Sequence, residues 1–322
     1  MKKSNYNCKN SIVFGVFWLI CIIVGHGQDF LQSPLDSLYA HYERSISNKT
    51  LAGVESLLIF NDSVIWHQAQ GFSDVTTETP LQANSIYYIQ SMTKPIISVA
   101  IMQLIERGLL TLDDPIEMYI PEAKNLRVAK NPDLGLDSPT QKVNRSLTIL
   151  DLLTHTSGLS HGLGESKLDQ QLFKALYDET LNYRSHNSLE DRVTTLLSFP
   201  LVAQPGTEWY YSAGADVLAL ILQRVSKQSI PTYLKTNIFD PLDMHDTGYN
   251  LNELQSRRVM KLHSRNERNT VKRHEQQVPT SGNTIYGGTH GLFSTASDYA
   301  QFCLMILHNG TWNGAQILND DS

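Results

Sequence analysis

Ser91 and Lys94 combine a hydroxyl and an amine at a spacing that suits nucleophilic chemistry. They form the only Ser-x-x-Lys pattern in the chain. Residues three apart on a helix share a face, so the lysine amine can reach the serine hydroxyl. An amine in that place can take the hydroxyl proton while the oxygen attacks a carbonyl carbon. The pattern by itself also occurs on solvated helix faces, so the surrounding elements must decide between the two readings.

The segment after this pair predicts a buried helix. Residues 96–105 are apolar nearly all round, which is typical of a helix in the interior of a protein. Pro95 fits the first turn, where a missing N–H is tolerated, and Gly108 supplies a stop at the other end. Ser91 is therefore expected at the mouth of a buried helix, with Lys94 one turn further on.

Composition places the chain among ordinary globular proteins. Its 322 residues are 41% hydrophobic and 18% charged, with a net charge of −6, which fits one large or two modest domains. The mild acidity and the lack of a basic cluster interleaved with aromatic residues argue against a nucleic-acid partner. Nothing in the sequence predicts a stable protein partner, and a small-molecule substrate is expected.

Residues 1–27 have the layout of a secretory signal peptide. Three lysines precede an apolar run at 12–24, and Gly25 and Gly27 give small residues before a cut at Gln28. The sequence therefore predicts an exported protein, periplasmic or secreted, with one domain over 28–322. An N-terminal membrane anchor is the alternative, although the run is short for a bilayer span.

Cysteine and histidine usage predicts no metal site and no internal disulfide. Cys303 is the one cysteine outside the first 27 residues, and its apolar neighbours predict a buried packing residue. No group of His and Cys has metal-ligand spacing. His67 lies on an expected strand and is taken as structural. His155 is a second candidate for a general base, but its spacing does not pair it with Ser91.

The remaining segments mix strands and helices, which predicts an α/β (α+β) fold. A hairpin is expected over 53–72, with the turn at Asn61-Asp62. Helical patterns cover 165–199, 217–222, 230–238 and 296–307, and 148–159 is expected to be a short helix that runs into a turn. Ser294 or Thr295 would cap the last of these helices. The polar stretches 130–146 and 250–283 are expected to be loops.

Five landmarks in chain order carry a family resemblance. They are Ser91-Met92-Thr93-Lys94, Leu112-Asp113-Asp114-Pro115, Leu152-Leu153-Thr154-His155-Thr156-Ser157-Gly158-Leu159, Pro205-Gly206-Thr207-x-Trp209-x-Tyr211-Ser212 and Gly288-x-x-Gly291-Leu292-x-Ser294-Thr295-Ala296-x-Asp298-Tyr299. Together they resemble the serine β-lactamase and penicillin-binding-protein superfamily, in its class C branch, from about residue 50 to 318. Their common order makes chance a poor explanation.

The resemblance implies roles for three residues. Ser91 would be the acylated nucleophile, Lys94 its base or proton relay, and Tyr211 the tyrosine of the second motif. The backbone N–H of Ser91 would donate half of an oxyanion hole. The implied fold is β-lactamase/transpeptidase-like, an antiparallel sheet flanked by helices plus a helical lobe, with Ser91 in the cleft between the two lobes. No cofactor and no metal are implied.

The second motif departs from the family pattern at Ala213, where β-lactamases and many penicillin-binding proteins carry Asn. That Asn helps to hold the amide side chain of the substrate, so its absence favours the esterase-like members, which tolerate the change and also favour Ser-Met-Thr-Lys. The sequence therefore predicts hydrolysis of a carboxylic ester. The alternative is a β-lactamase or D-alanyl-D-alanine carboxypeptidase, acting on a β-lactam or a peptidoglycan-derived amide.

The family's third motif, a Lys-Thr-Gly or its His-x-Gly or Trp-x-Gly counterpart, is not found. His308-Asn309-Gly310 lies at the end of the last expected helix, and His290-Gly291 belongs to the loop before that helix, so neither is accepted. In the family, further strands that follow this point pair with the N-terminal hairpin. We therefore expect a domain without its C-terminal strands, either because the sequence is incomplete or because the gene is truncated. A catalytically inactive relic or a binding protein is the second alternative.

Overall fold

The structure, a computed structural model, describes residues 33–177 and 186–322. The signal peptide predicted over 1–27 lies outside these residues. Contacts divide the chain into two units, one running to Leu81 and including His263–Arg273, the other formed by Gln82–Leu262 and His274–Ser322. Among the described residues, no helix is both long enough and apolar enough to cross a membrane.

The first unit is built on an antiparallel sheet in the order β1-β2-β3. Its strands are β1 (Gly53–Phe60), β2 (Ser63–Asp74) and β3 (Thr79–Pro80), and a helix covers residues 33–47. Asn61 and Asp62 both have positive φ angles, 47° and 62°, as the type I′ turn of a two-residue hairpin requires. The predicted hairpin is confirmed. Four apolar side chains near the turn are exposed, namely Leu58, Phe60, Val64 and Ile65.

A second hairpin in this unit corrects one prediction. Within 250–283, expected to be a loop, the structure has the strands β7 (His263–Arg265) and β8 (Val271–Arg273), which pair with each other in this unit. The same stretch also contains helix α8 (Glu253–Ser256), which belongs to the second unit. The strands are held by the rest of the unit, since the Arg273 guanidinium contacts the Asp74 carboxylate at 2.9 Å. Polar strands of three residues carry no alternation that a sequence pattern could reveal.

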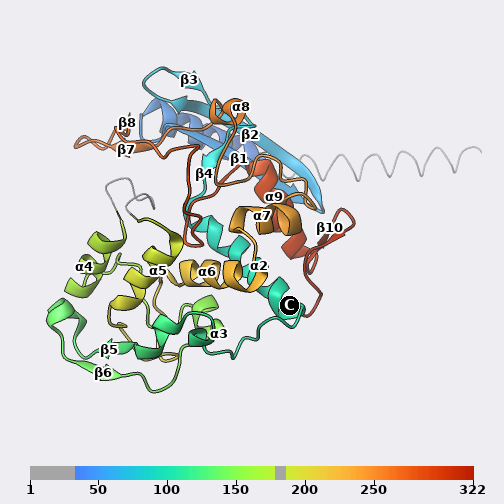
Figure 1. Cartoon of the computed structure of the whole chain (residues 1–322). Coiled ribbons are helices and arrows are strands. Elements are labelled where there is room, and N and C mark those ends of the chain that lie inside the picture. The colour runs from blue at the N-terminus through green and yellow to red at the C-terminus, as the bar shows by residue number, and fades with distance from the viewer. Residues whose placement is uncertain (1–32, 178–185) are drawn as a thin grey trace, which may run out of the picture. The chain divides into compact units, whose positions relative to one another are not determined.

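The second unit is mainly helical, with α2 and α6 packed against each other (Figure 1). Its helices are α2 (Thr93–Glu106), α3 (Ile149–Leu153), α4 (Lys167–Leu176), α5 (Leu189–Ser198), α6 (Gly214–Ser226), α7 (Ile230–Leu234), α8 and α9 (Ala296–Leu307). The predicted buried helix is α2, in which nine of the 14 residues are buried. Gly108 follows it with a φ of 66°, a left-handed conformation that ends the helix at little cost.

Short antiparallel strand pairs complete this unit. They are β4 (Tyr87–Tyr88) with β9 (Phe293–Ser294), β5 (Arg127–Ala129) with β6 (Thr140–Lys142), and β10 (Thr311–Trp312) with β11 (Ala315–Gln316). The β4–β9 pair sets Tyr88 opposite Phe293. Beyond it, the Ile89 N–H donates to the Leu292 carbonyl at 3.0 Å. This pairing brings the loop before β9 next to the start of α2.

Two further predictions are wrong in detail. Part of 130–146, expected to be a loop, pairs as β6 with β5. Cys303, expected to be buried, is exposed. Helix α9 buries Phe302 and Met305 on one face, and Cys303 lies on the other face with the exposed Leu307. Because both faces of α9 carry apolar residues, the sequence does not reveal which face points inward.

Candidate active site

Ser91, Lys94 and Tyr211 converge in the second unit. Ser91 lies in a single 3₁₀ turn (Gln90–Met92) directly before α2, and Lys94 is the second residue of that helix. The Lys94 Nζ donates to Ser91 Oγ at 3.2 Å, and the Tyr211 hydroxyl lies 2.9 Å from the same oxygen. The Lys94 Nζ also lies 4.6 Å from the centre of the Tyr211 ring. One serine oxygen is thus contacted by two groups that can move a proton.

Lys94 is fixed by a second contact, to the loop before β9. Its side chain is buried, with the residue 8% exposed, and its Nζ donates to the Thr289 carbonyl at 3.0 Å. Thr289 is 195 residues from Lys94 in the chain. A buried lysine nitrogen is costly unless it has hydrogen-bond partners, so this carbonyl helps to hold Lys94 in place beside Ser91.

The position of Thr289 depends on a buried ion pair between α5 and α6. The Asp216 Oδ1 accepts hydrogen bonds from the backbone N–H groups of Gly288 and Thr289, at 2.9 and 2.8 Å. The Asp216 Oδ2 accepts from Arg192 Nε at 2.7 Å, and both side chains are 1% exposed. Arg192 in turn donates to the Leu176 carbonyl. The ion pair therefore ties the loop that holds Lys94 to two helices.

The electrostatic balance at Asp216 favours its charged form. Burial raises the pKa of this carboxyl, but the Arg192 guanidinium, His290 and the backbone donors outweigh burial and lower the pKa to about 2. The backbone of Gly288 comes very close to α6, because a Cβ on it would lie 2.0 Å from the Ala215 carbonyl oxygen. Only glycine allows the loop this approach.

His155, the second candidate base, contacts Tyr211 and Ser212 but has no contact with Ser91. Its Nδ1 accepts from the Ser212 backbone N–H at 3.3 Å, and its ring lies 4.9 Å from the ring of Tyr211. Burial, with a contribution from Lys94, lowers the pKa of His155, so the ring is neutral at pH 7. His155 thus supports the second-motif segment, and the structure does not bring it to Ser91.

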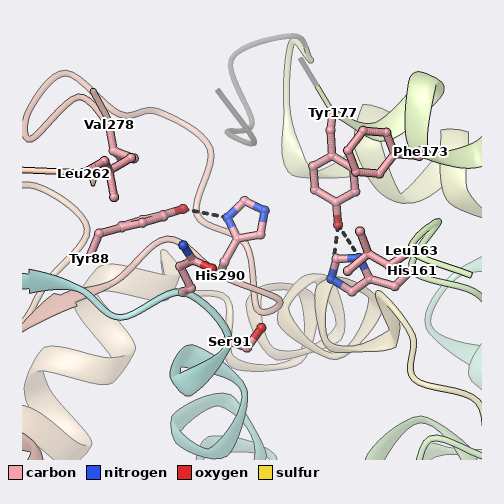
Figure 2. A pocket seen from close by; sticks show the side chains of 10 residues that line it. Tyr88, Ser91, His161, Leu163, Phe173, Tyr177, Leu262, Val278 and His290 are labelled. Atoms are coloured by element: carbon pink, nitrogen blue, oxygen red, sulfur yellow. Dashed lines mark hydrogen bonds between the residues drawn. The ribbon is translucent and has the colours of Figure 1, made fainter. Parts of the chain in front are cut away.

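A cavity of about 130 Å³ opens beside Ser91 (Figure 2). Its lining includes Tyr88, His161, Tyr177 and His290. The Tyr88 hydroxyl lies 2.8 Å from His290 Nδ1, and the Tyr177 hydroxyl lies 3.0 Å from His161 Nδ1. His161 is stacked on Tyr211 with 5.4 Å between ring centres, so one wall of the cavity continues to Tyr211, whose hydroxyl contacts Ser91 Oγ.

Sequence reasoning missed several of these residues. Asp216 left a signal, since it is a charge among apolar residues on a helix that buries its neighbours, whereas Arg192 follows the charged Glu190 and Asp191 and left none. Gln90 left none: its φ of 45° is a left-handed conformation, which costs a non-glycine residue about 1–3 kcal/mol and is typical of functional sites. His290, set aside as a third-motif candidate, lines the cavity next to Ser91, whereas His308 is exposed beside Trp312.

The buried histidines predict a loss of stability on mild acidification. Burial, assisted by Lys94, lowers the pKa of His161 to about 4, and burial lowers the pKa of His290 to about 3. In the unfolded chain both titrate near pH 6.5, so between about pH 6.5 and 4 the unfolded state binds more protons. The free energy of unfolding should therefore decrease as the pH is lowered through that window, by up to about 1.4 kcal/mol per pH unit for each histidine.

Urea unfolding near pH 7 and near pH 5 measures this loss. The His161→Gln and His290→Gln variants should each show a smaller drop in unfolding free energy between the two pH values than the parent protein. Equal drops in the parent and both variants would show that other groups cause the pH dependence.

Comparison with known proteins assigns the chain to a family. Residues 40–321 match the model of the Beta-lactamase family. The chain belongs to the Beta-lactamase family. The predicted resemblance to the serine β-lactamase and penicillin-binding-protein superfamily is confirmed, and so is the α/β fold of that superfamily.

Individual relatives are similar to this chain over part of their length. Protein Rv1367c of Mycobacterium tuberculosis is 30% identical over 274 residues, covering 84% of this chain and 66% of the relative. Esterase EstB of Burkholderia gladioli is 29% identical over 217 residues, covering 66% of this chain and 50% of the relative. The chain thus spans about one half to two thirds of the length of these curated relatives.

Solved structures share the fold. EstCE1, described as a hydrolase with promiscuous acyltransferase activity, superposes with a TM-score of 0.72 at 20% identity, covering 88% of this chain and 75% of that one. At this identity the likeness supports the fold alone.

Proposed function

We propose that the protein is an exported serine hydrolase that forms an acyl-enzyme on Ser91 and hydrolyses a carboxylic ester. One observation carries the proposal: Ser91 Oγ lies within hydrogen-bond distance of both the Lys94 amine and the Tyr211 hydroxyl. A nucleophile with a base held beside it, and with that base anchored by a third group, is the arrangement that covalent catalysis needs. Here the third group is the Thr289 carbonyl.

The acylation step follows from these contacts. Ser91 Oγ attacks the ester carbonyl carbon while Lys94 takes its proton, and the carbonyl oxygen becomes an oxyanion. When the intermediate collapses, the bond between the carbonyl carbon and the alcohol oxygen breaks. Tyr211 passes a proton to the departing alkoxide, so the alcohol leaves neutral and Lys94 restores the tyrosine proton.

Deacylation repeats the sequence with water as the nucleophile. Water attacks the acyl carbon and gives up one proton through the same two residues. The bond between the acyl carbon and Ser91 Oγ then breaks, the proton returns to that oxygen, and the carboxylic acid is released. One water is consumed in each cycle, and no cofactor enters the balance.

Two features favour an ester over an amide or a β-lactam. Ala213, fully buried at the start of α6, offers no side-chain amide to hold a substrate amide. The described residues that line the cavity beside Ser91 include no lysine or arginine, the side chains that best bind a substrate carboxylate. The relative from Burkholderia gladioli is named an esterase, which agrees with this preference.

A fluorophosphonate probe tests the proposal. The full-length protein should gain the mass of one phosphonyl group, and peptide mapping should place it on Ser91. The protein should also hydrolyse 4-nitrophenyl butyrate with a higher kcat/KM than nitrocefin. A folded protein that takes up no probe would be an inactive relic or a binding protein, and faster nitrocefin turnover would make it a β-lactamase.

Tyr211→Phe should lower kcat/KM for the ester about 100-fold, because it removes the hydroxyl 2.9 Å from Ser91 Oγ and keeps the ring. The matched control is Tyr210→Phe, since the Tyr210 hydroxyl donates to Asp169 and not to the serine. Tyr210→Phe should stay within about threefold of the parent. If the two variants lose equal activity, Tyr211 has no special part in proton transfer.

A further inference from the structure

The cavity beside Ser91 has an unusual lining. Five of its residues carry aromatic rings: Tyr88, His161, Phe173, Tyr177 and His290. Figure 2 shows Tyr88 on the left of the view, Tyr177 and His161 on the right, His290 between them and Ser91 below. All these residues belong to the second unit of the chain. Any substrate group placed in this cavity is next to the nucleophile.

The rings hold one another in fixed positions. Each tyrosine hydroxyl is hydrogen-bonded to a histidine, Tyr88 to His290 and Tyr177 to His161. Tyr177 is stacked on His161 at 5.5 Å and lies 5.8 Å from the ring of His290. Phe173 packs on Tyr177 at 5.2 Å. Because these rings hold one another in place, little ordering is needed when a ligand binds.

The four titratable rings are neutral at neutral pH. Burial lowers the pKa of His161 to about 4 and of His290 to about 3. Burial raises the pKa of Tyr88 and of Tyr177. A charged substrate group would lose hydration here and gain no opposite charge from these rings, whereas a neutral ring would lose little.

The size of the cavity limits its occupant. Its volume of about 130 Å³ is close to the roughly 150 Å³ of an apolar protein cavity that binds benzene. Aromatic side chains favour aromatic partners in offset or edge-to-face contact over aliphatic groups of equal size. We propose that the substrate is an ester with one aromatic ring close to the scissile bond, held in the cavity lined by Tyr88, His161, Phe173, Tyr177 and His290. This inference rests on the proposed function of Ser91.

Matched pairs of esters test the ring while keeping its size. The acyl side is tested by methyl phenylacetate against methyl cyclohexylacetate, and the alcohol side by benzyl acetate against cyclohexylmethyl acetate. In at least one pair the phenyl ester should have a kcat/KM about three- to tenfold higher, although cyclohexyl is the more hydrophobic group. The pair that shows the preference identifies which part of the ester occupies the cavity. Equal or better turnover of the cyclohexyl ester in both pairs would overturn the inference.

A variant links the preference to the cavity. Phe173→Leu replaces one ring of the lining with an aliphatic group, and the ratio of phenyl to cyclohexyl turnover should fall towards one. Phe199→Leu is the matched control, because Phe199 is also half-buried against the core but does not line the cavity. It should keep the parental ratio. If both variants or neither change the ratio, the cavity is not the source of the preference.

These results separate the inference from the function on which it rests. Ethyl acetate and the fluorophosphonate probe carry no aromatic ring in the acyl or alcohol part. If the protein reacts with both but prefers no phenyl ester, the inference alone fails. If it reacts with neither them nor the phenyl esters, the proposed function fails as well.

Discussion

Ser91→Ala should abolish ester turnover, with a fall in kcat of about 10⁶-fold, as when the nucleophile of a serine hydrolase is removed. The reason is that, within the part of the chain that the structure describes, no hydroxyl other than Ser91 Oγ is hydrogen-bonded to both Lys94 and Tyr211. The fold should survive, because Ser91 is exposed and precedes α2. Measurements of ester hydrolysis by purified parent and variant, together with intact mass after probe treatment, give the answer.

Lys94→Met and the double variant decide whether the two residues act as one unit. Methionine keeps the length of the apolar stem and removes the amine, so we expect a loss of about 10²- to 10⁴-fold on the acylation rate. Residues that act together lose activity non-additively, so adding Lys94→Met to Ser91→Ala should cause almost no further loss. Additive losses would mean that Lys94 supports some other step.

The second large effect concerns stability. Asp216→Ala should lower the free energy of unfolding by about 3–5 kcal/mol, since it leaves the buried guanidinium of Arg192 without its counter-charge. It also removes the acceptor of the Gly288 and Thr289 N–H groups, so the carbonyl that holds Lys94 loses its support. Urea unfolding measures the first consequence, and the rate of probe labelling at Ser91 measures the second.

Glu190→Ala is a matched control for this variant. Glu190 pairs with Arg224 between the same two helices, α5 and α6, but its side chain is 59% exposed. Exposed ion pairs contribute little, so this variant should lose less than about 1 kcal/mol and keep its labelling rate. Similar losses of unfolding free energy in both variants would show that the buried ion pair stabilises the fold no more than the exposed one does.

The pH dependence of Asp216 follows from its lowered pKa. The unfolded carboxyl titrates near pH 3.8, and the folded one near pH 2. Its stabilising effect is therefore fully present above about pH 4 and is lost as the pH falls towards 2. This loss comes after the one caused by the buried histidines, which begins near pH 6.5.

Local sequence was enough for the elements whose geometry depends on near neighbours. The i, i+3 spacing of Ser91 and Lys94 and the apolar run after them predicted two side chains in contact at the start of a buried helix, and the structure places them within hydrogen-bond distance there. Asn61-Asp62 predicted a turn because both residues tolerate positive φ. Thr295, one of two expected caps, accepts a hydrogen bond from the Asp298 N–H.

Motif order extended this to Tyr211, which is 120 residues from Ser91 in the chain. Spacing alone did not bring the two together; the family pattern did. The same pattern placed Ala213 where an Asn is expected and so pointed to an ester. The roles of Ser91, Lys94 and Tyr211 in catalysis stay predictions, to be tested by the variants above.

The tertiary structure decided what surrounds this pair. Lys94 contacts the Thr289 carbonyl, the Thr289 N–H contacts Asp216, and Asp216 pairs with Arg192. These contacts join segments that lie far apart in the sequence. Such contacts depend on how helices and loops pack, and neither propensity nor periodicity records packing between distant segments. For the same reason no sequence pattern predicted the aromatic cavity. The sequence by itself predicted a nucleophile, Ser91, and its base, Lys94, whereas the packing of distant segments decided which carbonyl holds Lys94 and what space lies beside Ser91.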